Sequence, residues 1–319
     1  MFEENPLIKC RNDVLEVVSS NELFLLQKNR AQRQFEYLTN HKEVSELSIL
    51  NFNENIEHLN TLADVYGFIG LNVVCPSKPV ILNNELATAG IKVDSIFEKY
   101  FCEDTSLYPL RKLLKHKSTR KLDTHYSGIG QWQLVISLLE KLNLNTSFVQ
   151  PIFDIKEQGG DLANMLCIES KYYETVFSNH AVKSAYTNKN ALSGNTGHII
   201  YKINSASIYG KRLVIFGDSF IVQCLDILSI FFDEIIYFRN SFVLEDIVRV
   251  LSPDIVITQQ AERYLVNIPS FRTSIPYLFK FLNSSYNPQL LDQSFLKATE
   301  ALFSPRDSKL YKKWRDSLV

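Results

Sequence analysis

The sequence lacks any apolar run of about 18 residues, the length that a membrane-crossing helix requires. It also lacks an excess of one charge, since 34 basic and 35 acidic residues leave a formal net charge of −1. A general attraction to nucleic acid is therefore not expected, and no nucleic-acid partner is predicted. The N-terminus, MFEENPLIKCRND, has no apolar core of a secretory signal, so we predict a cytoplasmic protein.

Cysteines are few and unpaired in their spacing. There are five, at positions 10, 75, 102, 167 and 224, and no two form a C-x-x-C pair. This argues against a disulfide framework and a zinc ribbon, and we expect free thiols. A glycine-rich phosphate loop is also missing, so no bound cofactor is predicted.

What is present suits a soluble globular chain with one large core or two smaller ones. The 319 residues are 45% hydrophobic and 22% charged. Periodicity predicts two short strands within 14–26, a helix within 43–68, a strand over 71–80 ending at Pro76, and helices over 89–99 and 131–143. Ser127 is a candidate N-cap for the last of these. Residues 147–210 are the least regular stretch, and we predict a substrate-facing insertion there.

From residue 211 the pattern alternates between strands and helices. KRLVIFGDSF (211–220) ends a buried strand, and a helix (220–232), a strand (234–238), a helix (242–251) and a strand (252–260) follow. This order implies parallel strands with right-handed crossovers. We predict an α/β three-layer fold with a mostly parallel sheet over 1–269, followed by a helical extension over 270–319.

The turn Gly217-Asp218-Ser219 is the first candidate for chemistry. Open α/β sheets bind ligands at the carboxyl ends of their strands, where Ser219 stands. The following helix would direct backbone N–H groups to the same place, as an oxyanion requires, while Gly217 permits the tight turn. The alternative is that Asp218 and Ser219 only cap the helix.

A serine nucleophile needs a base, and His125 in Asp123-Thr124-His125 is the candidate. Residues two apart in an extended segment point the same way, so Asp123 would orient the imidazole. Two alternatives are a surface turn with a chance histidine and a metal site. No tight His/Cys cluster completes a metal site, so no metal is predicted.

Several motifs together resemble the SGNH-like acetyltransferase family that includes the alginate O-acetylation proteins. They are LEVVSSNELFLL, VVCPSKPVI, KLDTHYSGIGQ, GGDLANML, VIFGDSF and PDIVITQQAERYL, in the family's order over roughly 14–265. The resemblance implies Ser219 as nucleophile, His125 as base and Asp123 as the orienting acid. Tyr126 stands where the family has tryptophan. Ordinary SGNH hydrolases carry the serine first, so the motif order here would be circularly rearranged.

The implied activity is O-acetyl transfer to a bacterial capsular or extracellular polysaccharide through an acetyl-serine. Alginate-type relatives work in the periplasm, whereas a cytoplasmic enzyme would use acetyl-CoA as the acetyl donor. A carbohydrate acetylesterase would use the same triad, and a non-catalytic polysaccharide-binding or assembly protein would keep the same fold. The predicted partners are an oligosaccharide or polysaccharide acceptor and a polysaccharide-synthesis complex.

The remaining candidates lie at later strand ends and in the tail. Asn240 or Gln260 would supply a second oxyanion donor, and Arg263 would bind an acidic sugar or form a buried ion pair with Glu262. Asp161, in Gly-Gly-Asp-Leu, is predicted to cap a helix, with contact to substrate as the alternative. Basic residues 309–315 around Trp314 would either contact anionic lipid, peripheral to the inner membrane, or form a solvated helix face.

Overall fold

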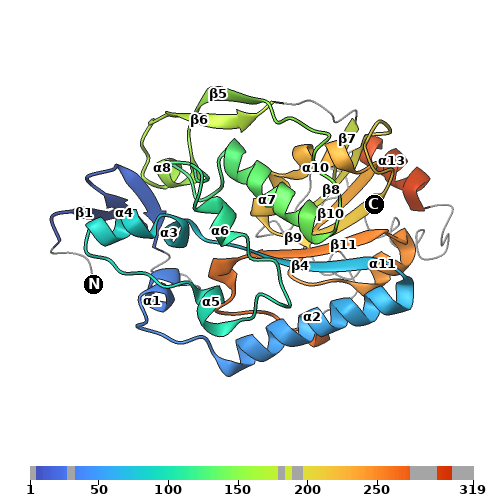
Figure 1. Ribbon diagram of the computed structural model, residues 1–319, viewed down its shortest axis with the longest axis horizontal. Helices are drawn as coiled ribbons and strands as arrows, with labels where there is room; N and C mark the ends of the chain where they lie inside the picture. Colours follow the sequence, from blue (N-terminus) through green and yellow to red (C-terminus); the bar gives the residue numbers. More distant parts are fainter. Residues whose placement is uncertain (1–4, 27–32, 179–183, 189–196, 274–292, 304–319) are drawn as a thin grey trace. The chain divides into compact units, whose positions relative to one another are not determined.

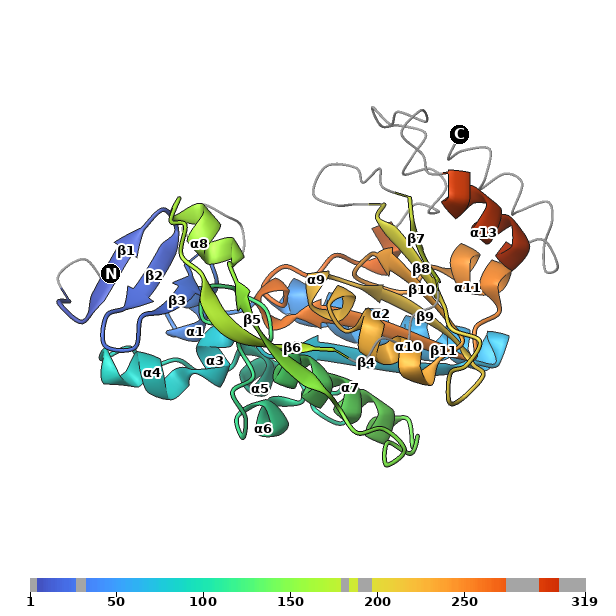
Figure 2. The same ribbon diagram turned by 90° about the horizontal axis from the view of Figure 1, so that it is seen from above.

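The structure is a computed structural model that describes residues 5–26, 33–178, 184–188, 197–273 and 293–303. Contacts divide the chain into two compact units, each assembled from segments distant in sequence. Unit 1 consists of residues 1–50, 74–179 and 261–268, and unit 2 of residues 51–73, 180–260 and 269–319. Figures 1 and 2 label the elements of both units.

Unit 1 contains a small antiparallel sheet, a β-hairpin and mostly short helices. The sheet has the order β1-β2-β3, formed by Ile8–Arg11, Val14–Val17 and Glu22–Leu25, so the predicted strand pair around Ser-Ser-Asn is confirmed. The hairpin pairs β5 (Phe153–Gln158) with β6 (Tyr172–Phe177). The helices are α1 (Gln34–Leu38), α3 (Lys78–Ile81), α4 (Asn83–Thr88), α5 (Ile96–Tyr100), α6 (Leu110–Leu113), α7 (Gly128–Lys141) and α8 (Asp161–Met165).

Unit 2 is built on a six-stranded sheet of order β4-β11-β9-β10-β8-β7. In chain order these strands are β4 (Ile69–Cys75), β7 (Ser184–Thr187), β8 (Ile199–Ile203), β9 (Arg212–Gly217), β10 (Glu234–Arg239) and β11 (Ile255–Ala261). β10 and β11 each pair in parallel with β9, which confirms the predicted α/β fold with parallel strands at its centre. β8 and β7 add an antiparallel edge.

Apolar side chains on one face of this sheet form a core with three helices. Val214, Phe216 and Phe238 from the strands pack with residues of α2 (Glu46–Tyr66), α11 (Glu245–Leu251) and α13 (Gln293–Phe303). α10 (Leu225–Phe231) packs against β10 and β8. Phe295 of α13 is fully buried, so this helix of the predicted extension is part of the core. The basic stretch 309–315 lies outside the described residues.

Three sequence predictions differ from the structure. The helix predicted over 220–232 is two helices, α9 (Ser219–Val222) and α10, separated at residues 223–224. The helix predicted over 89–99 begins only at Ile96, because Gly90 adopts φ +76° and Ser95 caps α5 by accepting from the Glu98 N–H. Part of the predicted insertion, β7 and β8, belongs to the sheet edge.

Two further observations bear on the sequence predictions. All five cysteines are free thiols, as predicted. None of the helices in the described part of the chain is both long and apolar enough to cross a membrane.

Candidate active site

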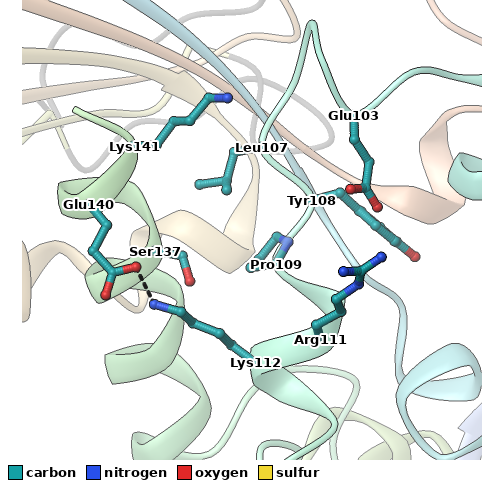
Figure 3. A pocket seen from close by; sticks show the side chains of 9 residues that line it. All are labelled: Glu103, Leu107, Tyr108, Pro109, Arg111, Lys112, Ser137, Glu140 and Lys141. Atoms are coloured by element: carbon teal, nitrogen blue, oxygen red, sulfur yellow. Dashed lines mark hydrogen bonds and ion pairs between the residues drawn. The ribbon is translucent and has the colours of Figure 1, made fainter. Parts of the chain in front are cut away.

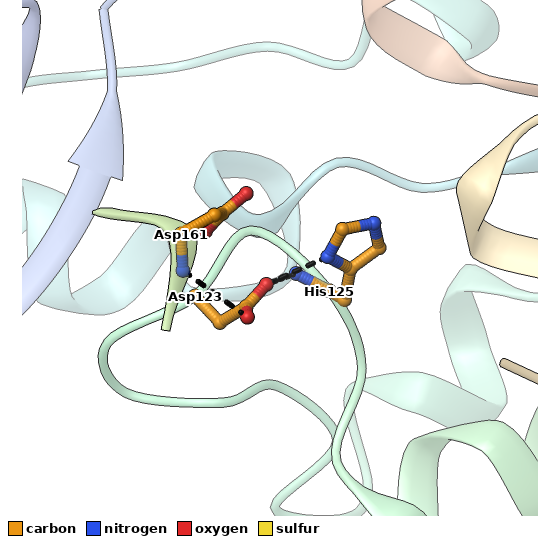
Figure 4. Close-up of side chains that lie close together, drawn as sticks. All are labelled: Asp123, His125 and Asp161. Atoms are coloured by element: carbon orange, nitrogen blue, oxygen red, sulfur yellow. Dashed lines mark hydrogen bonds and ion pairs between the residues drawn. The ribbon is translucent and has the colours of Figure 1, made fainter. Parts of the chain in front are cut away.

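Asp123 and His125 form a directly hydrogen-bonded pair in the loop before α7 (Figure 4). The ring Nδ1 of His125 lies 2.6 Å from Asp123 Oδ1, and the backbone N–H of His125 donates to the same oxygen at 2.9 Å. The side chain of His125 is only 14% exposed and that of Asp123 only 11%. The two-residue spacing therefore produces the contact that the sequence predicted.

Asp123 is ionised at neutral pH. Burial raises the pKa of Asp123, but hydrogen bonds from His125 and the charge of its protonated form outweigh burial and hold this pKa below its ordinary value. Arg120, with its guanidinium 3.9 Å away, acts in the same direction. An ionised Asp123 accepts from Nδ1–H, so Nε2 of His125 carries the basic lone pair.

Asp161 holds this loop from the N-terminus of α8. Its carboxylate accepts from the Thr124 backbone N–H at 2.8 Å and from the Thr124 hydroxyl at 2.6 Å. Its own N–H donates to Asp123 Oδ2 at 3.3 Å. Burial and the neighbouring Asp123 charge raise the pKa of Asp161, against the hydrogen bonds from Thr124. The predicted capping role of Asp161 is wrong, because Gly160 is the N-cap of α8 and no side chain caps this helix; the Asp161 carboxylate instead binds the loop of Asp123 and His125.

Asp123, His125 and Asp161 also offer oxygen or nitrogen atoms within 4.8 Å of one another, close enough to bind one metal ion (Figure 4). The atoms already have other partners: His125 Nδ1 bonds to Asp123, and both oxygens of Asp161 accept from Thr124. A metal would have to replace these contacts. The arrangement therefore favours a hydrogen-bonded network over a metal centre.

The second half of the predicted triad lies in unit 2, at the end of β9. Ser219 is the first residue of α9, and Asp218 is the N-cap, accepting from the Phe220 N–H at 2.9 Å. The capping role proposed for Asp218 is therefore confirmed. Ser219 follows the carboxyl end of the central parallel strand, where a nucleophile would be accessible. Asp123 and His125 belong to unit 1.

Gln259 fixes the turn before Ser219, a role that sequence reasoning missed. Its amide oxygen accepts from the Asp218 N–H at 2.9 Å, and its Nε2 donates to Asp218 Oδ1 at 3.0 Å. Gly217 must be small here, since a Cβ would lie 2.8 Å from Gln259 Oε1 and 2.7 Å from Ile221 Cγ2. The turn is therefore rigidly specified by packing and by reciprocal hydrogen bonds.

The two predicted oxyanion candidates lie at the ends of the strands that flank β9. Arg239 pairs with Gly217, which places Asn240 one residue beyond the end of the β9 ladder. The Asn240 amide donates to the carbonyl of Phe242. Gln260 is buried in β11, next to Gln259. Both lie at the carboxyl edge of the parallel strands, as the sequence predicted.

Tyr126 and Glu262 have structural surroundings in unit 1. The Tyr126 side chain is 1% exposed and its hydroxyl donates to the Pro76 carbonyl at 2.7 Å, so it packs inside rather than forming a sugar-binding surface. The buried carboxylate of Glu262 accepts from Ser77, Ser95 and the Phe97 N–H. These contacts take the place of the predicted ion pair, and the Arg263 guanidinium lies over the ring of Tyr264.

Comparisons with solved structures give the fold independently. A DHHW family protein from Eubacterium siraeum matches with a TM-score of 0.51 and 13% identity over 82% of this chain and 94% of that chain. Bacillus cereus PatB1 with a sulfonyl adduct matches with a TM-score of 0.55 and 10% identity over 82% of this chain and 100% of that chain. The O-acetyltransferase domain of Pseudomonas putida AlgJ matches with a TM-score of 0.40 and 11% identity over 74% of this chain and 90% of that chain, and nothing is concluded from a TM-score this low.

At these identities the matches show a shared fold and no more. No family model matches the sequence, and none of the curated proteins does.

A separate hollow of about 380 Å³ lies in unit 1, along α6 and the C-terminal half of α7 (Figure 3). Its floor includes Leu107 and Pro109, and its rim carries Arg111 and the Lys112–Glu140 ion pair. His125 precedes the other end of α7, which is about 20 Å long at 1.5 Å per residue. This hollow is therefore separate from the Asp123–His125 pair.

Proposed function

We propose that the protein is an O-acetyltransferase that modifies a bacterial capsular or extracellular polysaccharide through an acetyl-serine intermediate. The observation that carries the proposal is the Asp123–His125 hydrogen bond of 2.6 Å. It keeps the imidazole in the tautomer whose Nε2 accepts a proton, which is the arrangement that activates a serine nucleophile. Ser219, at the carboxyl end of a parallel strand, is the proposed nucleophile.

The reaction has two acyl transfers. Ser219 Oγ attacks the acetyl carbonyl carbon of the donor while His125 Nε2 takes the hydroxyl proton. The tetrahedral intermediate collapses to acetyl-Ser219, and His125 returns the proton to the leaving group. A sugar hydroxyl then attacks the acetyl-serine, its proton passes to His125, and Ser219 leaves with that proton. Attack by water in the second transfer would make the same site an acetylesterase.

An oxyanion forms in each transfer and needs donors. We assign one donor to the Ser219 backbone N–H and the second to the side chain of Asn240 or Gln260, which lie at the ends of the flanking strands. Gly217 and Asp218 set the shape of this turn. Arg263 is proposed to contact an acidic sugar. The triad order Asp, His, Ser would make this a circularly rearranged SGNH arrangement, with the catalytic domain at 1–269.

The donor and the cellular setting belong to the same proposal. We propose acetyl-CoA as the donor, a cytoplasmic site of action and association with a polysaccharide-synthesis complex. The test of the donor is acetyl transfer from radiolabelled acetyl-CoA to a saccharide acceptor. A finding that only an activated ester acylates the protein would remove acetyl-CoA from the proposal.

The first experiment measures hydrolysis of p-nitrophenyl acetate by the wild type and by Ser219→Ala, His125→Ala and Asp123→Asn. Loss of one member of a serine triad lowers kcat by about 10⁴-fold or more, and we expect losses of this order. A sulfonyl fluoride is a suitable label, because such reagents react with activated serines, and PatB1 has been solved with a sulfonyl adduct. Mass spectrometry should locate the label on Ser219.

Matched controls use exposed residues outside the site, Ser147→Ala and His116→Ala. Both should retain wild-type turnover, and circular dichroism should show that all variants are folded. Wild-type protein that neither hydrolyses the ester nor reacts at Ser219 would contradict the proposal. It would favour a non-catalytic polysaccharide-binding or assembly protein.

A further inference from the structure

A lysine is buried beside the loop that carries Asp123 and His125. Lys78 is the first residue of α3, just after β4, and its side chain is 3% exposed. Lysine is almost never buried to this degree unless its charge is compensated and its hydrogens are bonded. Burial lowers the pKa of Lys78, although Glu22, Glu174 and Asp123 act in the opposite direction.

Lys78 forms an ion pair with one residue and donates hydrogen bonds to the main chain of others. Glu22 on β3 supplies the counter-charge, with Oε2 2.9 Å from Nζ. The hydrogen bonds of the ammonium go to backbone carbonyls: Arg120 at 2.7 Å, Lys121 at 2.8 Å and, more weakly, Asp123 at 3.5 Å. A buried cation is therefore directed at the main chain that leads into Asp123.

The same loop is bound from its other sides by residues that contact its other atoms, and the Leu23 N–H adds a longer hydrogen bond of 3.4 Å to the Lys121 carbonyl. Glu174 accepts from the Lys121 N–H, Asp161 binds Thr124, and the Tyr126 hydroxyl reaches Pro76, two residues before Lys78. Lys78 makes the shorter hydrogen bond to the Lys121 carbonyl, at 2.8 Å, and also binds the Arg120 carbonyl, at 2.7 Å. Carbonyl orientation sets the direction of the chain at Asp123, and the Nδ1–Oδ1 distance of 2.6 Å depends on that direction.

We propose that Lys78 is a positioning residue for the Asp123–His125 pair, holding the carbonyls of Arg120, Lys121 and Asp123 so that Asp123 meets His125 Nδ1. It acts through the main chain and touches neither the substrate nor the reacting atoms. The proposal rests on the function proposed above for its effect on catalysis. The competing role is structural only: Lys78 and Glu22 stabilise unit 1 as an ion pair.

The two roles separate in the double variant Lys78→Met, Glu22→Leu. Replacing both members of a buried ion pair by apolar side chains is often neutral for stability, whereas removing one leaves an uncompensated charge. If Lys78 is a positioning residue, the double variant folds but its kcat for ester hydrolysis falls by about 10²-fold, the cost of a misplacement of about 1 Å. KM should change by less than about threefold, because no substrate contact is lost.

A second readout does not depend on activity. The hydrogen-bonded Nδ1–H of His125 should give a downfield proton resonance in the wild type, assigned by its absence in His125→Ala. We expect this resonance to disappear or broaden in the double variant and to persist in Lys115→Met, which removes an exposed lysine from the neighbouring segment. Wild-type protein without esterase activity but with this pattern would refute the proposed function and support the positioning role.

The single variant Glu22→Gln covers the case in which the double variant does not fold. It removes the counter-charge but leaves the Lys78 hydrogen bonds, so kcat and the Nδ1–H resonance should stay near wild type while the protein becomes less stable. Wild-type kcat together with an intact resonance in the double variant would overturn the positioning role and leave the proposed acetyl transfer standing. Loss of kcat in Glu22→Gln would also overturn the positioning role.

Discussion

Two adjacent glycines beside the candidate site, Gly159 and Gly160, should differ strongly in how much stability the protein loses when each is replaced by alanine. Gly160 has an extended backbone, φ −159° and ψ 162°, which alanine also adopts, so conformation alone does not require glycine there. A Cβ on Gly160 would nevertheless lie 1.9 Å from the Leu122 carbonyl oxygen and 2.9 Å from the Asp123 nitrogen. A Cβ on Gly159 would meet no atom within 4 Å.

The size of the effect follows from that contact. Cβ contacts below 3.0 Å essentially never occur, so in Gly160→Ala the Leu122 oxygen has to move by about 1.1 Å. It would lose the N–H bonds from Leu162 and Ala163, now 3.2 and 3.3 Å long. Two lost hydrogen bonds of about 1 kcal/mol each and overpacking of at least about 1 kcal/mol give about 3 kcal/mol of destabilisation.

The assay compares Gly160→Ala with Gly159→Ala by urea unfolding and by ester hydrolysis. Gly159→Ala should change the free energy of unfolding by less than about 0.5 kcal/mol and leave kcat unchanged. Gly160→Ala should also lower kcat by about 10²-fold, because Leu122 immediately precedes Asp123. Equal stability and equal kcat for the two variants would refute the claim that close packing of α8 against Leu122 positions Asp123.

Two other predictions concern buried carboxylates. Glu262→Gln should destabilise the protein by about 2–4 kcal/mol in urea unfolding, because its amide would place a donor against the donors of Ser77, Ser95 and Phe97. A loss below about 0.5 kcal/mol would show that these contacts are not needed. The folded-state pKa of Asp123 is lowered, so its stabilising contribution is present above its unfolded pKa of about 3.9 and is lost as the pH falls. The stability difference between wild type and Asp123→Asn should therefore stay constant above about pH 5 and shrink as the pH falls below about 4, and a difference independent of pH would contradict this assignment.

The sequence alone located much of the local structure of the site. Hydrophobic continuity followed by Gly217 identified β9 and the turn before Ser219, because a buried strand and a sharp turn each leave a clear local pattern. The spacing of Asp123 and His125 was enough to predict their contact, since residues two apart in an extended segment project to the same side. Ser127 as the cap of α7 was likewise a local signal.

What surrounds these residues was decided only by the tertiary structure. Lys78, Asp161 and Glu174 reach the loop of Asp123 and His125 from positions 37 to 53 residues away in sequence, and Gln259 reaches Asp218 across 41 residues. No periodicity records such contacts, because a polar side chain has the same local pattern whether it faces water or a buried carbonyl. The sequence thus determined which residues are chemically able to act, and the packing of distant segments decided which others hold them in place.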